Sequence, residues 1–280
     1  MQIWYSIIDT ILPFEWLTLN FMKNALLAIL FVAPTFGLLS TMVVNNKLAF
    51  FSEAIGHSTL TGIAIGVLLG IGDPVWAMVI FSVLLAIIIS IVNKNSTSST
   101  DTIIGVFSST SIAIGTVILS RGGGFAKYST FLIGDLLSIT PLEIGILILV
   151  FFGVLIFWLV FFNDLLIVSM NKSLANSRKI SVFTMETIFT VLIAIIVTIS
   201  IQWVGLLIIN SFLILPAATS RNLARNVKEY HIISVIVACL SGIIGLIASY
   251  YLGSATGATI VVAMSIFYIA TLIIKTIRNL

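Results

Sequence analysis

Two side chains that can bind a metal ion, Glu53 and His57, lie four residues apart within a largely apolar stretch. Thr61 follows at the same interval, so on a helix the three side chains share one narrow stripe. Carboxylate and imidazole groups bind zinc, and manganese also accepts them. An ionisable residue at the bilayer centre costs roughly 2.5–3.5 kcal/mol, so it usually faces a bundle interior or an aqueous path. The stripe therefore predicts either a cation path or an interhelical hydrogen-bonded lock.

Three glycines follow the stripe at four-residue spacing, Gly62, Gly66 and Gly70. On a helix they lie about 140° around the axis from His57, at roughly 100° per residue. Small residues in this pattern let a neighbouring helix approach closely. We therefore expect one side of this helix to pack against another helix while the side of Glu53 and His57 lines a path.

The composition of the chain indicates that Glu53 and His57 lie on a membrane helix. The chain has 280 residues, of which 60% are hydrophobic and 8% charged, and this excludes a soluble globular domain. A span needs about 20 apolar residues, and eight or nine such runs predict an all-α polytopic membrane protein. We expect an interfacial segment at 1–20 and a single membrane domain at 21–280. The predicted spans lie at about 21–44, 50–71, 75–92, 102–120, 142–162, 180–201, from 203 to an end at Pro216, 231–252 and 258–275.

Basic residues predict the orientation of the spans, because cytoplasmic loops collect positive charge. Ten of the 13 lysines and arginines fall on one side of the predicted membrane. This asymmetry places the C-terminus in the cytoplasm, and it explains the net charge of +3 as a topology signal rather than a nucleic-acid-binding surface. The inner group is Lys47, Lys94, Lys172, Arg178, Lys179, Arg221, Arg225, Lys228, Lys275 and Arg278, and the outer group is Lys23, Arg121 and Lys127.

A second notable stretch begins where an apolar run gives way at Pro216 to basic residues, Arg221, Arg225 and Lys228. Such an amphipathic stretch can dock on a partner protein. The charges alone are also explained by membrane topology. We treat residues 215–230 as a candidate coupling segment.

Three other carboxylates have predicted roles outside the path. Glu186 follows the start of a predicted span and is expected to pair locally near the inner face. Asp73 and Asp135 lie in outer breaks between spans, where helix capping is the expected role and contact with a binding protein is the alternative.

Four segments together resemble the permease subunits of zinc and manganese ABC importers. The first segment contains Glu53 and His57, and the fourth contains Pro216. The sequence departs from the family pattern at Glu53, where the family usually has aspartate, and at Ser109, where zinc-type members often have histidine. The four resembling segments are 52–62, 101–105, 131–141 and the pair 204–208 with 215–219, of which the last is the most specific.

The resemblance implies a homodimeric channel in the bacterial cytoplasmic membrane, a cytoplasmic ATPase on each copy and an external metal-binding protein. It implies that Pro216, Arg221, Arg225 and Lys228 serve ATPase coupling, and that the chain has no resident cofactor. The transported ion is then zinc or manganese, with iron as a further candidate. Because one chain offers two ligands, we hypothesise that a two-fold axis brings a second Glu53 and His57 to make four.

Two other function classes are alternatives to an importer subunit. A proton-coupled secondary metal transporter would use Glu53 and Glu186 as proton relays and would need no ATPase. An intramembrane metalloprotease would need a His-Glu-x-x-His motif, which the sequence lacks. The sequence also lacks the Gly-rich, Lys-containing phosphate loop of an ATPase, so the chain is not expected to be an enzyme.

Overall fold

The computed structural model describes residues 2–11, 14–71, 74–121 and 134–278. Every regular element in these ranges is a helix, which confirms the all-α prediction. Eight of the described helices are long and apolar enough to cross a membrane. The helices are α1 (Gln2–Ile11), η1 (Glu15–Leu17), α2 (Asn20–Asn45), α3 (Phe51–Leu68), α4 (Pro74–Asn95), α5 (Thr100–Arg121), η2 (Leu136–Ser138), α7 (Pro141–Met170), α8 (Lys172–Ser177), α9 (Val182–Val204), α10 (Leu206–Leu223), α11 (Val227–Leu252) and α12 (Thr256–Arg278).

Helix α3, which carries the predicted stripe, is not among the eight apolar helices. Its 18 residues include Glu53, His57 and several hydroxyl side chains, and these lower its apolar content. Thirteen of its residues are nevertheless buried, so protein rather than lipid surrounds most of the helix. Polar residues of membrane helices are tolerated in this situation, because they face a bundle interior.

The chain divides into two compact units. Unit 1 contains Met1–Thr41, Asp135–Ile156 and Trp203–Leu280, and unit 2 contains Met42–Gly134 and Phe157–Gln202. Three helices, α2, α7 and α9, continue through these boundaries and supply residues to both units.

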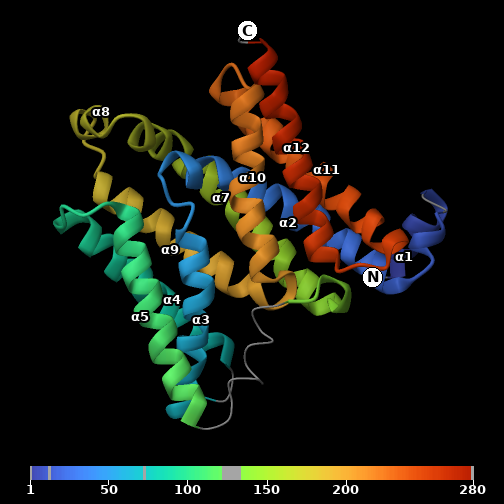
Figure 1. Cartoon of the computed structure of the whole chain (residues 1–280), viewed down its shortest axis with the longest axis horizontal. Helices are drawn as coiled ribbons and strands as arrows, with labels where there is room; N and C mark the ends of the chain where they lie inside the picture. Colours follow the sequence, from blue (N-terminus) through green and yellow to red (C-terminus); the bar gives the residue numbers. More distant parts are fainter. Residues whose placement is uncertain (1, 12–13, 72–73, 122–133, 279–280) are drawn as a thin grey trace. The chain divides into compact units, whose positions relative to one another are not determined.

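In unit 1, the helices α10, α11 and α12 lie side by side (Figure 1). Close approach of α11 and α12 depends on Gly245, since a Cβ added there would lie 2.4 Å from the Cα of Ile260. Helix α2 is joined to α11 by the buried hydroxyls of Ser40 and Ser234, whose oxygens are 2.8 Å apart. Small and hydroxyl-bearing residues at these contacts are typical of helix packing in membranes.

In unit 2, helix α3 packs on α4 and on α5, and the three appear as neighbouring blue, teal and green ribbons in Figure 1. The end of α2, the second part of α7, the short α8 and most of α9 complete this unit. The candidate residues Glu53 and His57 therefore belong to unit 2.

One predicted helix end is wrong, because α10 does not end at Pro216 but continues to Leu223. Proline lacks an N–H group and crowds the carbonyl four residues earlier, which normally ends or kinks a helix. Membrane helices tolerate it where hydroxyl side chains bond to nearby backbone groups. Here the Thr219 Oγ1 donates to the carbonyl oxygen of Leu215 at 2.7 Å.

The fifth predicted span, 142–162, is also too short. Helix α7 extends from Pro141 to Met170, and α8 follows after one residue. The predicted span ends just before the polar pair Asn163 and Asp164, but apolar residues follow this pair immediately. Two polar side chains within one turn do not interrupt the backbone hydrogen bonds of a helix.

Candidate functional site

The start of α3 places Glu53 in the first helical turn. A tight turn precedes the helix, in which Lys47 has a left-handed φ of 58° and the Leu48 N–H donates to the Val43 carbonyl at 2.9 Å. A carboxylate in the first turn interacts favourably with the partial positive charge of the helix N-terminus. His57 follows one turn later, about 6 Å farther along the axis.

One side of α3 packs tightly against α4 through two of the predicted glycines. A Cβ added to Gly62 would lie 2.9 Å from the Cα of Met78, and one added to Gly66 would lie 2.5 Å from the Cβ of Ala77. The packing prediction is wrong for Gly70, since nothing lies within 4 Å of a Cβ added there. Gly70 instead follows the helix end with a φ of +70°, a conformation that glycine adopts at little cost.

Another side of α3 packs against α5 at Thr61. The Thr61 hydroxyl donates to the backbone carbonyl of Ser111, and the Ser111 hydroxyl donates to Thr61 Oγ1 at 3.2 Å. A Cβ on Gly115 would lie 2.9 Å from the Thr61 backbone nitrogen. Thr61 is only 1% exposed, so it does not belong to an open stripe with Glu53 and His57. That part of the sequence prediction is wrong, because a neighbouring helix covers the third position.

The remaining side of α3 carries the two candidate ligands. Before the last turn of the helix, the only positions that are not buried are Glu53, which is exposed, and His57 and Ile65, which are partly exposed. Within the part of the chain that the structure describes, the side chains of Glu53 and His57 make no hydrogen bond and no ion pair. Their ligand atoms are therefore available to a cation.

One chain supplies few ligands at this position. Among the residues in the described ranges, no three His, Cys, Asp or Glu side chains come together as a metal-binding group. Zinc sites usually have four ligands, so Glu53 and His57 of a single chain leave a bound ion with open positions. Ser109, at the position where zinc-type members of the resembling family often have histidine, is exposed on α5.

The other carboxylates that sequence reasoning singled out are placed differently. Glu186 pairs with Lys172, with 2.7 Å between Oε1 and Nζ. Asp135 caps η2, because its Oδ1 accepts from the Leu137 N–H at 3.0 Å. Asp73 lies outside the described residues. The local pairing and capping roles expected for Glu186 and Asp135 agree with this geometry.

The candidate coupling segment lies in unit 1 and forms the tight link between α10 and α11. Arg221, in the last turn of α10, is exposed, as are Arg225 and Lys228. The link is fixed by Glu229, whose Oε2 accepts from the Arg225 N–H at 2.9 Å and whose Oε1 accepts from the Asn226 side chain at 2.8 Å. Three cationic side chains thus project from a rigid turn, while Pro216 is buried inside α10.

Sequence reasoning missed two features of unit 2. Gly115 positions α5 against Thr61, and its four-residue spacing from Ser111, a second small residue, is the sequence signal that would have marked it. Lys172 was counted only as a topology signal, although it is the partner of Glu186. No local sequence pattern predicts a contact between two residues that lie 14 positions apart on either side of a helix end.

Comparison with known proteins gives the family of this chain. The model of the ABC 3 transport family matches residues 18–275. The chain is 32% identical over 238 residues to the high-affinity zinc uptake system membrane protein ZnuB of Haemophilus influenzae, covering 84% of this chain and 90% of that protein. It is 29% identical over 259 residues to the manganese import system permease protein ScaB of Streptococcus parasanguinis, covering 91% of each.

A solved structure agrees with these sequence matches. PsaBC from Streptococcus pneumoniae, determined in complex with a Fab, aligns with a TM-score of 0.77 and 27% identity, covering 97% of this chain and 95% of that chain. The match of the family model over most of the sequence, the relative above 30% identity and the shared fold agree: the chain is a multi-pass membrane protein of the ABC 3 transport family.

Proposed function

We propose that the chain is the permease subunit of an ABC importer that carries a divalent transition metal, zinc or manganese with iron as a further candidate, into the cytoplasm. The observation that carries this proposal is the open side of α3, where Glu53 and His57 have no partner in the described chain. An interhelical lock would require both side chains to be hydrogen-bonded. Relatives named for zinc uptake and for manganese import support the same substrate class.

The proposed transport path requires a second copy of the chain. Glu53 and His57 give an ion two protein ligands, and a two-fold axis would double this number. Weak coordination suits transit, because an ion held too strongly would not leave. The metal is the cargo, and its identity depends on geometry and delivery as well as on ligand type.

Energy for transport is assigned to separate ATPase subunits at the cytoplasmic face. The sequence contains no phosphate-binding loop of its own. Arg221, Arg225 and Lys228 project from the turn between α10 and α11, and we assign this turn, with Pro216, to ATPase coupling. The C-terminus is then cytoplasmic, the membrane is the bacterial plasma membrane, and an external binding protein delivers the metal to the opposite face.

The alternative of a proton-coupled secondary transporter loses support from the position of Glu186. A proton relay needs a carboxylate that is free to exchange protons, whereas Glu186 lies 2.7 Å from the Lys172 ammonium. Only Glu53 remains for this mechanism, and a single site does not form a relay.

The test is uptake of radioactive zinc or manganese by liposomes that contain the chain with and without its ATPase subunits. We expect uptake only with the ATPase and ATP, and loss of uptake in a Glu53→Ala/His57→Ala double variant that still assembles with the ATPase. Asp164→Asn removes another carboxylate from unit 2 and serves as the matched control. Uptake driven by a pH gradient without ATPase would overturn the importer proposal, and full uptake by the double variant would overturn the role of α3.

A further inference from the structure

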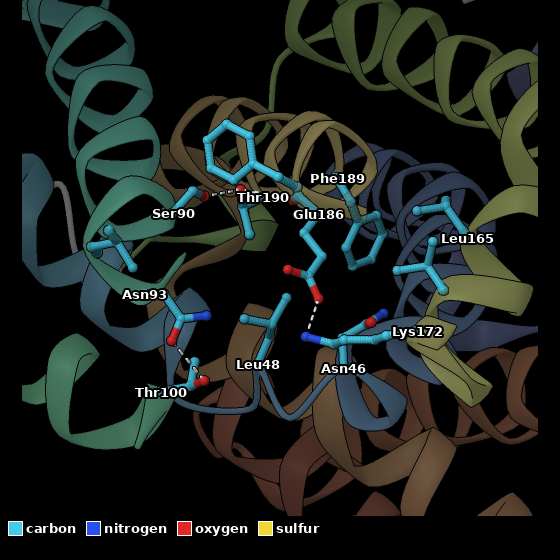
Figure 2. A pocket seen from close by; sticks show the side chains of 13 residues that line it. Asn46, Leu48, Ser90, Asn93, Thr100, Leu165, Lys172, Glu186, Phe189 and Thr190 are labelled. Carbon is cyan, nitrogen blue, oxygen red and sulfur yellow. Dashed lines mark hydrogen bonds and ion pairs between the residues drawn. The ribbon is translucent and has the colours of Figure 1, made fainter. Parts of the chain in front are cut away.

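Unit 2 contains a pocket that the proposed metal path does not use. Four of its polar lining residues are Asn46 after α2, Asn93 on α4, Lys172 on α8 and Glu186 on α9. Figure 2 shows the Glu186 carboxylate pointing into the pocket, toward the Lys172 ammonium. All of the lining residues belong to unit 2, so a single unit forms this pocket.

The pocket lies at the ends of membrane helices. Asn46 and Asn93 lie at the C-terminal ends of α2 and α4, Lys172 follows α7, and Glu186 is in the second turn of α9. α2, α4, α7 and α9 are all among the helices that can cross a membrane. Helix ends of this kind lie at the depth of lipid head groups, where the hydrocarbon core gives way to water. This placement holds whichever face of the membrane is cytoplasmic.

The lining changes from polar to apolar within the pocket. Ile89, Leu165, Val168 and Phe189 are buried, with exposed fractions of 1–2%. The polar residues Asn46, Asn93 and Thr100 are partly exposed, and Lys172 is exposed. A phospholipid has the same order, with a charged head group joined to apolar chains.

The two charges in the pocket are available for exchange. The Lys172 side chain is 64% exposed and that of Glu186 is 29% exposed. Exposed ion pairs contribute little to stability, so opening this pair is easy. Asn93 uses its Oδ1 to accept from Thr100 at 3.0 Å, and Asn46 uses its Nδ2 to donate to the Met42 carbonyl at 2.8 Å. Among the described residues the amide nitrogen of Asn93 has no acceptor, so it can donate to a ligand oxygen.

We propose that this pocket binds the head group of an aminophospholipid, a lipid with both a phosphate and a primary ammonium group. Lys172 binds the phosphate, and the Asn93 amide supplies a further donor. Glu186 accepts hydrogen bonds from the ammonium. The Lys172–Glu186 pair opens, and each member exchanges its protein partner for the opposite charge of the head group.

The charges in the pocket disfavour two other ligand classes. A divalent cation would meet the Lys172 ammonium beside Glu186, the only carboxylate among the described lining residues. A choline lipid has the same phosphate, but its quaternary ammonium has no N–H to donate to Glu186. The carboxylate therefore discriminates between ethanolamine and choline head groups, because a charge-assisted hydrogen bond is among the stronger contacts available.

The test measures lipid retention by the whole chain with its ATPase subunits. The complex is purified from nanodiscs that contain phosphatidylcholine and phosphatidylethanolamine in equal amounts, and bound lipid is counted by native mass spectrometry. We expect about a tenfold preference for phosphatidylethanolamine, since a hydrogen bond to a charged group corresponds to roughly that ratio. Glu186→Gln should abolish the preference, and Lys172→Gln should lower retention of both lipids.

Matched variants distinguish the loss of a contact in the pocket from a general change in the charge of the protein. Lys172→Arg keeps the phosphate ligand and should retain the lipid, and Lys179→Gln removes an exposed lysine outside the lining and should change nothing. Equal retention of the two lipids by the unchanged protein, or an undiminished preference in Glu186→Gln, would overturn the proposal. Displacement of the lipid by equimolar soluble glycerophosphoethanolamine would overturn the assignment to a membrane lipid. None of these measurements requires metal or ATP, so their outcome is independent of the transport proposal.

Discussion

Two glutamates of unit 2 lie near the start of membrane-embedded helices but have opposite surroundings. Glu53 is the third residue of α3, is exposed, and has no ion pair or hydrogen bond in the described ranges. Glu186 is the fifth residue of α9 and lies 2.7 Å from Lys172. Both residues were candidates for transport chemistry on sequence grounds. Of the two, only Glu53 is unpaired among the described residues.

The two sites differ in whether the carboxylate already has a partner within the protein. A cation path needs a ligand whose charge is not already balanced by the protein. At Glu186 a transported ion would have to displace an ammonium group, whereas at Glu53 it would meet an unpaired carboxylate and an imidazole one helical turn away. Tight packing of α3 on α4 and α5 leaves this one side of the helix open.

The largest expected effect follows from giving Glu53 the kind of partner that Glu186 has. In His57→Lys, an ammonium group would lie four residues after the glutamate, the favourable order for an ion pair on a helix. We expect metal uptake to fall by at least about 100-fold, or about 2.7 kcal/mol in the barrier. Uptake of radioactive metal by reconstituted complex measures this, with His57→Gln as the uncharged control. Normal uptake by His57→Lys would remove the distinction between the two glutamates.

A second change disturbs the packing that holds α3 in place. A methyl group at Gly62 would lie 2.9 Å from the Met78 backbone, so we expect Gly62→Ala to destabilise the protein by about 1–3 kcal/mol, as overpacking does. Gly105→Ala on α5 is the matched control, since nothing lies within 4 Å of a Cβ there. Thermal unfolding in detergent compares them. Equal stability of the two variants would contradict the packing of α3 on α4.

A third change removes the hydrogen bond that covers the third position of the stripe. Thr61→Val keeps the shape of the side chain but leaves the Ser111 carbonyl and hydroxyl without their partner. We expect a loss of about 1 kcal/mol of stability, typical of one buried hydrogen bond. Denaturation in detergent measures it, with Thr102→Val, an exposed threonine of α5, as control. A loss no larger than that of the control would indicate that Thr61 faces an open path after all.

The smallest expected effect concerns the ion pair at Glu186. Because the Lys172 side chain is 64% exposed, the coupling energy of the pair should be only about 0.2–1 kcal/mol. A double-mutant cycle with Lys172→Ala and Glu186→Ala, read by thermal unfolding, gives this value. The coupling should weaken with added salt. A coupling of several kcal/mol would show that the pair is a structural element rather than an exchangeable one.

Much of the fold and the position of the candidate ligands could be predicted from the sequence. Long apolar runs determine that the chain crosses the membrane as helices, because unpaired backbone groups are too costly in lipid. The four-residue spacing determines that Glu53 and His57 share one side of a helix, because the helical period is a local property. The close approach of α3 to a neighbour at Gly62 and Gly66 follows from the same spacing.

The tertiary structure alone decided which of these side chains remain open. Thr61 continues the stripe in sequence, yet α5 covers it, and Glu186 has a lysine partner from beyond a helix end. Helix α10 continues through Pro216 with a threonine hydroxyl bonded to the preceding turn. The physical reason is that exposure and pairing depend on how each helix is rotated against its neighbours. That rotation results from packing contacts between distant parts of the chain, which the local order of residues does not encode.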